Sequence, residues 1–229
     1  MQRLRAGITC FCLIVICGCR SFGPPAGYKA GQLLLPDSPT RDRAALHDKN
    51  PDIRRWSILS LAQQGDERIT PEIALHLNPS LEPSPLVRST AAIALMRLGD
   101  QRAVPALDRA CSDNEPFVRA DAVLALGALG GPDTVPRLTG ILRDDNDIRV
   151  RRHAARALAL TGSRTAFEPL IEELANQDDS LAFECHRALG RLSGKDLPPV
   201  RHAWTEWVKA MDASRPETSS SPSVTPSAP

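Results

Sequence analysis

One short pattern of apolar and small residues recurs five times along the 229-residue chain. Within each repeat the first, fifth, eighth and ninth positions are apolar or small, which is the spacing of one face of an α-helix. Successive repeats start 34, 31, 32 and 31 residues apart. The pattern therefore predicts five helices, each of which buries one stripe of side chains. The repeats start at Ile53, Val87, Val118, Val150 and Leu181.

The sizes of the residues on this stripe indicate close helix packing. The fifth and eighth positions hold Ala, Ser or Cys in every repeat, and the ninth position is always Leu. Small side chains let neighbouring helices approach, and the leucine fills the space between them. Glycine, which tolerates the left-handed conformation of a helix C-terminus, ends four of the five repeats. These glycines are Gly65, Gly99, Gly130 and Gly162.

A second helix is predicted in each repeat. A proline lies 18 or 19 residues after each repeat start, and apolar residues follow it at helical spacing. Proline is tolerated in the first turn of a helix. The prolines are Pro71, Pro105, Pro136, Pro169 and Pro199. Because one helical hairpin cannot bury both of its faces, the repeats predict an all-α fold, a right-handed α-solenoid of about five helical hairpins.

The recurring residues resemble a known repeat. The pattern Val-Arg-x-x-Ala-x-x-Ala-Leu-x-x-Leu-Gly, followed by a short loop and x-Val-Pro-x-Leu, is similar to the HEAT-like repeat named for phycobilisome lyases, over about residues 48–210. The resemblance implies a HEAT-like solenoid, but lyases, hydroxylases and binding scaffolds share this fold. The hydroxylases hold two irons through His-Glu pairs. This sequence has five histidines and no His-Glu dipeptide, so we expect no such metal centre and no cofactor.

Four repeats also share one acidic and one basic position. The acid lies five residues before the repeat start and the arginine one residue after it. Both fall at the turn between repeats, so each arginine is placed to reach the acid of an adjacent repeat. We interpret the set as a structural ladder, with a ligand site as the alternative. The fifth repeat has Asn176 and Ala182 instead. The ladder positions are Asp48, Glu82, Asp113 and Asp145 with Arg54, Arg88, Arg119 and Arg151.

The charge balance limits the possible partners. The chain has 28 basic and 27 acidic side chains, and 42% of its residues are hydrophobic, which excludes a polyelectrolyte and a wholly disordered chain. We therefore expect no nucleic-acid partner. Between residues 143 and 164, six arginines outnumber three aspartates. This excess is either a solvated helix face or a docking patch for an acidic protein or an anionic polymer, centred on Arg149, Arg152 and Arg156.

The N-terminus has the features of an export signal. Arg3 and Arg5 precede an uncharged apolar run over residues 11–18, which is too short to span a membrane. The segment from Ile16 to Cys19 resembles the bacterial lipoprotein box, which implies cleavage before Cys19 and lipidation of its thiol. The alternatives are a plain signal peptide cleaved nearby and a buried N-terminal helix.

The remaining segments complete the predicted organisation. Residues 1–18 are a lipoprotein signal peptide, 19–37 a tether, 38–212 the repeat domain with a short capping helix at its start, and 213–229 a disordered Ser/Pro/Thr tail. Trp204 and Trp207 are expected to seal the far end of the core. Cys111 and Cys185 fall in different repeats, so no disulfide is expected.

These features predict a membrane-anchored, non-catalytic protein-binding scaffold of the bacterial cell envelope. The N-terminal lipid, which includes a palmitate-type acyl chain, would attach it to the cell membrane or the outer membrane, facing the periplasm or the exterior. Its protein partner is unidentified. The sequence contains no glycine-rich phosphate loop and no Gly-x-Ser-x-Gly motif, so we predict no enzymatic activity. The alternative is an enzyme or enzyme accessory resembling the HEAT-like chromophore lyases.

Overall fold

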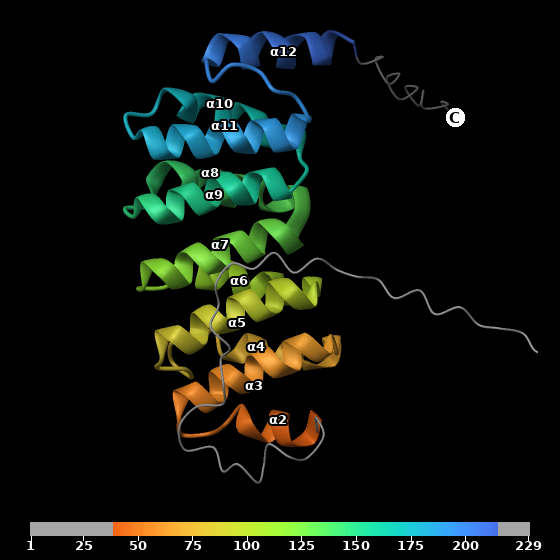
Figure 1. Ribbon diagram of the computed structural model, residues 1–229, viewed down its shortest axis with the longest axis vertical. Helices are drawn as coiled ribbons and strands as arrows, with labels where there is room; N and C mark the ends of the chain where they lie inside the picture. The colour runs from red at the N-terminus through yellow and green to blue at the C-terminus, as the bar shows by residue number, and fades with distance from the viewer. Residues whose placement is uncertain (1–38, 215–229) are drawn as a thin grey trace, which may run out of the picture.

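The computed structural model describes residues 39–214, and over this range the protein is an all-α solenoid without strands (Figure 1). This confirms the predicted fold class. A short helix, α2 (Pro39–Ala45), precedes five stacked hairpins. The first helix of each hairpin is long: α3 (Pro51–Gln64), α5 (Pro85–Leu98), α7 (Pro116–Gly130), α9 (Ile148–Leu160) and α11 (Asp179–Ser193). The second helices are α4 (Thr70–Leu75), α6 (Val104–Ala110), α8 (Val135–Asp144), α10 (Phe167–Glu172) and α12 (Arg201–Ala213).

Proline and glycine mark the ends of the long helices. Proline occupies the first position of α3, α5 and α7, where its missing N–H leaves no hydrogen bond unmade. Gly65 and Gly99 take positive φ angles of 71° and 78°. The prediction that Gly130 ends its helix with a positive φ angle is wrong by one residue. Gly130 is still helical, and Gly131 has the positive φ angle, 60°. Gly131 precedes Pro132, and the residue before a proline is disfavoured in the α conformation.

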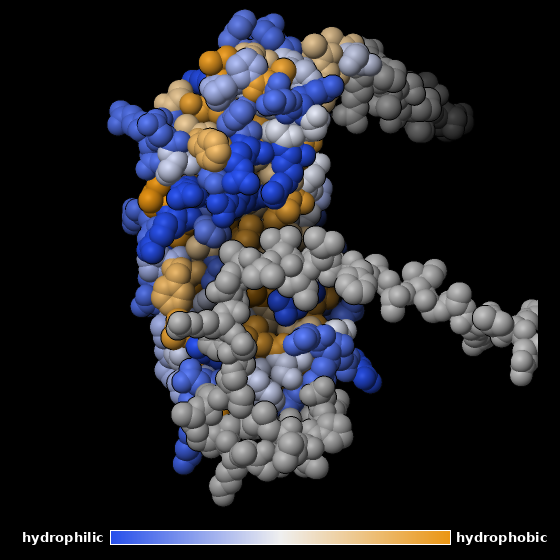
Figure 2. Space-filling view, in the orientation of Figure 1, coloured by the Kyte–Doolittle hydropathy of each residue, from blue (hydrophilic) through white to orange (hydrophobic). Residues whose placement is uncertain are grey.

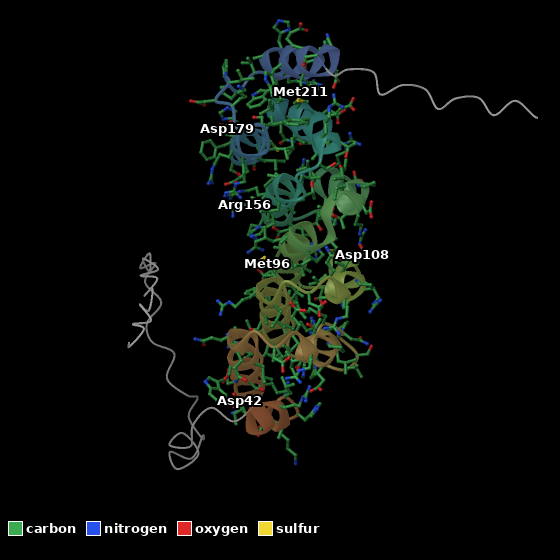
Figure 3. The ribbon with its side chains drawn as sticks, turned by 90° about the vertical axis from the view of Figure 1, so that its right-hand side faces the viewer. Asp42, Met96, Asp108, Arg156, Asp179 and Met211 are labelled. Atoms are coloured by element: carbon green, nitrogen blue, oxygen red, sulfur yellow. The ribbon has the colours of Figure 1, made fainter. Side chains whose placement is uncertain are left out.

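The helices form two layers of different spacing. The long helices make one layer and the second helices of the hairpins make the other (Figure 3). Neighbouring long helices pack against each other closely, whereas neighbouring second helices contact each other little. The solenoid therefore bends toward the long helices, and their outer side forms its concave face. Met96 and Arg156 lie on this face, and Asp108 lies on the opposite one (Figure 3).

The small residues of the repeat allow this close packing. The fifth and ninth positions are buried in every repeat, as in Ala122 and Leu126 of α7. The approach is tightest between α7 and α9. A Cβ atom placed on Gly127 would lie 2.5 Å from the carbonyl oxygen of Ala157, so no side chain fits there. Glycine is required at this position by the neighbouring backbone and not by a turn.

Both ends of the core are covered within the described residues. At the start, Leu46 is fully buried after α2, and the Asp42 carboxylate accepts hydrogen bonds from Ser60 Oγ (2.7 Å) and Gln64 Nε2 (3.0 Å) of α3. At the far end, Trp204 of α12 is fully buried, and its ring meets that of Trp207 edge to face at 6.1 Å. The two tryptophans therefore cover the C-terminal end of the core, as the sequence predicts.

Several sequence features fall differently or outside the described range. Helix α12 begins at Arg201, two residues after Pro199, and ends at Ala213, one residue beyond the predicted domain limit. The predicted signal peptide (1–18) with Cys19, the tether (19–37) and the tail from residue 215 onward lie outside the described residues. Cys111, just after α6, and Cys185 of α11 are both buried and free, as expected for different repeats.

Two glycine substitutions should have opposite effects on stability. Gly127→Ala should lower the free energy of unfolding by about 1–3 kcal/mol, because its methyl group meets the backbone of Ala157. Gly140→Ala in α8 should raise it by about 0.5–1 kcal/mol, because a Cβ there meets nothing within 4 Å and alanine favours the helix. Urea unfolding of both variants measures the difference. Equal effects would contradict the close approach of α7 to α9.

Candidate functional site

The ladder arginines connect successive turns of the solenoid. Arg88 of α5 donates through Nε and Nη2 to the two carboxylate oxygens of Asp113, at 2.7 and 2.9 Å. Its Nη1 donates to the backbone carbonyl of Glu82, the acid of its own repeat, at 3.0 Å. Arg54 and Arg119 repeat this arrangement one hairpin earlier and one hairpin later. Each of the three guanidinium groups therefore holds two consecutive turns at a fixed separation.

The acids of the ladder also shape the turns that contain them. One carboxylate oxygen of Asp113 accepts the backbone N–H of Glu115 at 2.9 Å, and Asp48, Glu82 and Asp145 each accept the N–H two residues onward in the same way. Burial would raise the pKa of Glu82, but hydrogen bonds from Arg54, the Ser84 N–H and His76 hold it below its ordinary value. These carboxylates are already occupied by bonds within the solenoid.

In the fifth repeat two residues replace the single acid: one forms the hydrogen bond of the turn and the other forms the ion pair. Asn176 occupies the acid's position and accepts the N–H of Asp178 at 3.0 Å, so the turn is kept. The charge comes from Glu173, which pairs with Arg151 at 3.1 Å and accepts a hydrogen bond from the Asn176 side chain. The ladder therefore reaches the last hairpin, although the repeat pattern shows no acid there. A search for carboxylates one helical turn before the expected position would have found Glu173.

The concave face has two chemically different halves. Leu59 of α3 and Ile93 of α5 are partly exposed, and they occupy the same helical position as Arg156 of α9 and Arg187 of α11. At this helical position the face is therefore apolar toward the start of the solenoid and basic toward its end. Figure 2 shows the strongly hydrophilic band where α9 and α11 lie.

The basic half contains a cluster that we call the arginine pocket. It consists of Arg152, Arg156, Arg187 and Arg191 around Glu184, whose side chain is 4% exposed. Arg156 donates through Nε and Nη2 to the two oxygens of Glu184, at 2.8 and 2.7 Å. Arg187 Nη1 donates to the same carboxylate at 3.2 Å, and Arg152 Nη2 lies 3.8 Å from it. The hydrogen bond from Arg156 keeps the pKa of Glu184 below its ordinary value, so the carboxylate stays ionised.

The three arginines of the predicted docking patch have different surroundings. Arg152 and Arg156 lie in the arginine pocket. Arg149 instead donates to both oxygens of Asp147, the N-cap residue of α9, and lowers the pKa of that carboxyl to about 2. Glu184, Arg187 and Arg191 were missed by the sequence analysis. Aligning the repeats by helical position would have placed Arg187 beside Arg156 on neighbouring helices.

A second polar group crosses the middle of the concave face. Ser89 of α5 donates its hydroxyl proton to Asp121 of α7 at 2.5 Å, and burial raises the pKa of Asp121. His153 of α9 is near enough to oppose that rise, but its Nδ1 lies 2.8 Å from the backbone carbonyl oxygen of Arg149. In a Ser-His-Asp triad the imidazole lies between the hydroxyl and the carboxylate. Here the carboxylate binds the hydroxyl directly, which is a different order.

Within residues 39–214, no group of three or more His, Cys, Asp or Glu side chains is close enough to hold a metal ion. In the same range, a histidine ring that lies within hydrogen-bond distance of a carboxylate or carbonyl oxygen has only one such partner. For example, His76 Nδ1 lies 3.2 Å from a carboxylate oxygen of Glu82.

Comparison with known proteins identifies the family. The family model described as HEAT repeats matches residues 75–159 and 141–210, which together span more than half of the chain. The chain belongs to the HEAT-repeat family. A search of curated proteins found no match to this HEAT-repeat chain.

One solved structure agrees with this assignment at the level of fold, and two others match with lower scores. The complex of CpcE and CpcF of phycocyanin lyase from Nostoc sp. PCC7120 matches with a TM-score of 0.61 and 18% identity, over 86% of this chain and 76% of that one. An engineered protein and human deoxyhypusine hydroxylase match with TM-scores of 0.47 and 0.45 and identities of 18% and 16%. These two matches cover 68% and 69% of this chain, and 79% and 74% of theirs.

The buried ladder pairs should matter far more than exposed pairs. Arg88→Met should lower the free energy of unfolding by about 3–5 kcal/mol, because Asp113 would keep a buried charge without its partner. Arg137→Met removes an exposed pair with Asp108 and should cost less than about 1 kcal/mol. Urea unfolding compares the two variants, and a similar cost for both would refute the ladder's structural role.

The lowered pKa of Glu184 makes stability depend on pH. A carboxyl that is harder to protonate when folded stabilises the protein above its unfolded pKa, near 4.5, and loses this contribution as the pH falls through the folded value. Stability should therefore decrease as the pH falls below about 5. In Glu184→Gln the decrease should be smaller over the same interval, as measured by urea unfolding at each pH. Identical pH profiles for the two proteins would contradict the assignment.

Proposed function

We propose that this HEAT-repeat protein is a lipid-anchored, non-catalytic scaffold of the bacterial cell envelope whose concave face binds a protein partner. The observation that carries the proposal is the composition of that face. Its charges are unbalanced in the arginine pocket, and the large apolar side chains of Leu59 and Ile93 are partly exposed on it. Stacked helical hairpins commonly use such extended concave surfaces to bind other proteins.

The structural neighbour is consistent with partner binding. That structure is a complex of two proteins, CpcE and CpcF. At 18% identity the likeness concerns the fold, so the partner of this chain is inferred from its own surface. The near-neutral charge of the chain favours a protein over a nucleic acid.

The lipid anchor is proposed from the N-terminal sequence. The basic start, the apolar run over residues 11–18 and the lipoprotein-box pattern ending at Cys19 support cleavage and lipidation at that residue. Two or more acyl chains hold a protein stably at a membrane. Among the helices within residues 39–214, none combines the length and the apolar character that crossing a bilayer requires.

A second candidate is an enzyme accessory related to chromophore attachment. The match to a phycocyanin lyase complex over 86% of the chain favours it, and the Ser89–Asp121 pair would be its most reactive group on the concave face. A lyase-type role should fail in Asp121→Asn and should leave a bound chromophore visible in the absorption spectrum. A scaffold should be insensitive to this substitution and carry no chromophore.

The anchor can be tested by cell fractionation. Cys19→Ala should move the protein from the membrane fraction to the soluble fraction, because the lipid has lost its attachment atom. Mass spectrometry of the wild-type N-terminus should find an acylated Cys19 as the first residue. Wild-type protein with an unprocessed, unlipidated N-terminus would refute the anchor.

The scaffold can be tested by crosslinking in intact cells. The wild-type protein should capture a protein partner, and Leu59→Ser with Ile93→Ser should reduce the capture, because both side chains lie on the concave face. The matched control is Leu75→Ser with Leu81→Ser, two exposed leucines at the end of α4 and in the loop that follows. Equal loss in both double variants, or no captured protein at all, would overturn the scaffold.

A further inference from the structure

The arginine pocket carries more positive charge than its surroundings compensate. Arg152, Arg156 and Arg187 surround one carboxylate, Glu184. Arg191 lines the same concavity without an ion pair to any described residue, so four guanidinium groups accompany a single carboxylate and three positive charges are in excess. By contrast, each ladder arginine has a carboxylate of its own. The two clusters use the same residue types, but the ladder is balanced and the pocket is not.

The acids near the pocket are committed to other bonds. Asp147 is held by Arg149. Asp178 approaches Arg152, but its carboxylate caps α11 by accepting the N–H groups of Ser180 and Leu181. Even when the charge of Asp178 is counted against Arg152, the four arginines of the pocket outnumber the two carboxylates, Glu184 and Asp178.

Several guanidinium donors of the pocket form no hydrogen bond with Glu184. Arg152 Nε is buried and has no hydrogen-bond partner. Arg187 is about half exposed and uses one nitrogen on Glu184. Arg191 is exposed and makes no ion pair or hydrogen bond within residues 39–214. Arg156, Arg187 and Arg191 line a concavity of about 240 Å³ together with Glu184 and two alanines.

Apolar groups flank these donors. Phe183 of α11 is 59% exposed, and the guanidinium carbon of Arg187 lies 5.9 Å from its ring centre. Leu160, at the end of α9, is 40% exposed. An anionic polymer or a free phosphate would gain little from such side chains, whereas a peptide with both carboxylates and apolar side chains would use them.

We propose that the arginine pocket binds an acidic segment of the protein partner, with Asp or Glu carboxylates on Arg187 and Arg191 and apolar side chains on Phe183 and Leu160. This inference rests on the proposed scaffold function and specifies its partner. The bidentate Arg156–Glu184 pair shows the geometry with which a guanidinium receives a carboxylate in this pocket.

The test uses the full-length protein in neutral detergent and a fluorescein-labelled helical peptide that carries Glu and Leu residues. Its counterpart has Gln at every Glu position. The pocket variant is Arg187→Ala with Arg191→Ala, which leaves the Arg156–Glu184 pair intact. The matched control is Arg109→Ala with Arg201→Ala, two exposed arginines on α6 and α12 that remove the same charge. Circular dichroism checks that both variants keep the wild-type melting temperature.

Fluorescence anisotropy should show that the Glu peptide binds about tenfold more weakly to the pocket variant than to the wild type or the control. The Gln peptide should bind the wild type more weakly by a similar factor, and added salt should weaken binding of the Glu peptide. No binding of the Glu peptide, equal binding of the two peptides, or equal binding by the two variants would overturn the inference. So would binding of phosphatidylglycerol vesicles or inorganic phosphate through the same arginines in place of the peptide.

Crosslinking in cells separates this inference from the scaffold itself. A partner captured by the wild type and lost in the pocket variant supports both. A partner captured equally by the pocket variant leaves the scaffold in place and removes the acidic-segment inference. Absence of any partner removes the proposed function.

Discussion

The guanidinium group that links two consecutive turns is the constraint on which the solenoid depends. Arg88 binds the carboxylate of the next turn and the backbone carbonyl of the preceding one, so the spacing between hairpins is fixed at the edge of the stack. A buried ion pair adds little net stability when compared with apolar residues, because both charges lose their hydration. Here the ion pair fixes the register of successive hairpins, because a hairpin that slips or rotates would leave a charge buried without a partner.

The concave face follows from this register. Once the turns are set, the small residues of the long helices can come together, and Gly127 lies directly against the backbone of Ala157. The second helices of the hairpins remain further apart. The unequal spacing of the two layers curves the stack and turns Arg156 toward the inside of the curve (Figure 3). The ladder ion pairs and the concave face therefore both depend on the same register of the hairpins.

Much of this fold could be predicted because its pattern is periodic. The repeat revealed the long helices, their buried stripe and the arginines that face acids of adjacent repeats. Features that depend on departures from the period were harder to predict. Gly131 takes the turn in place of Gly130 because of the following Pro132, and Glu173 supplies the charge that the regular position lacks. The arginine pocket was predicted in part, since Arg152 and Arg156 were singled out, whereas Glu184 and Arg187 come from a distant segment that meets them only in the folded stack.

The two buried cysteines make the thiol reactivity of the chain depend on whether it is folded. Cys111 and Cys185 are removed from solvent, and burial raises the pKa of each thiol to about 12. At neutral pH almost none of either thiol is then ionised, and the thiolate is the form that attacks disulfides and oxidants. The folded solenoid therefore protects its own thiols without pairing them. They can form incorrect disulfides only while the chain is unfolded, so a substitution that unfolds the solenoid more often also exposes its thiols more often.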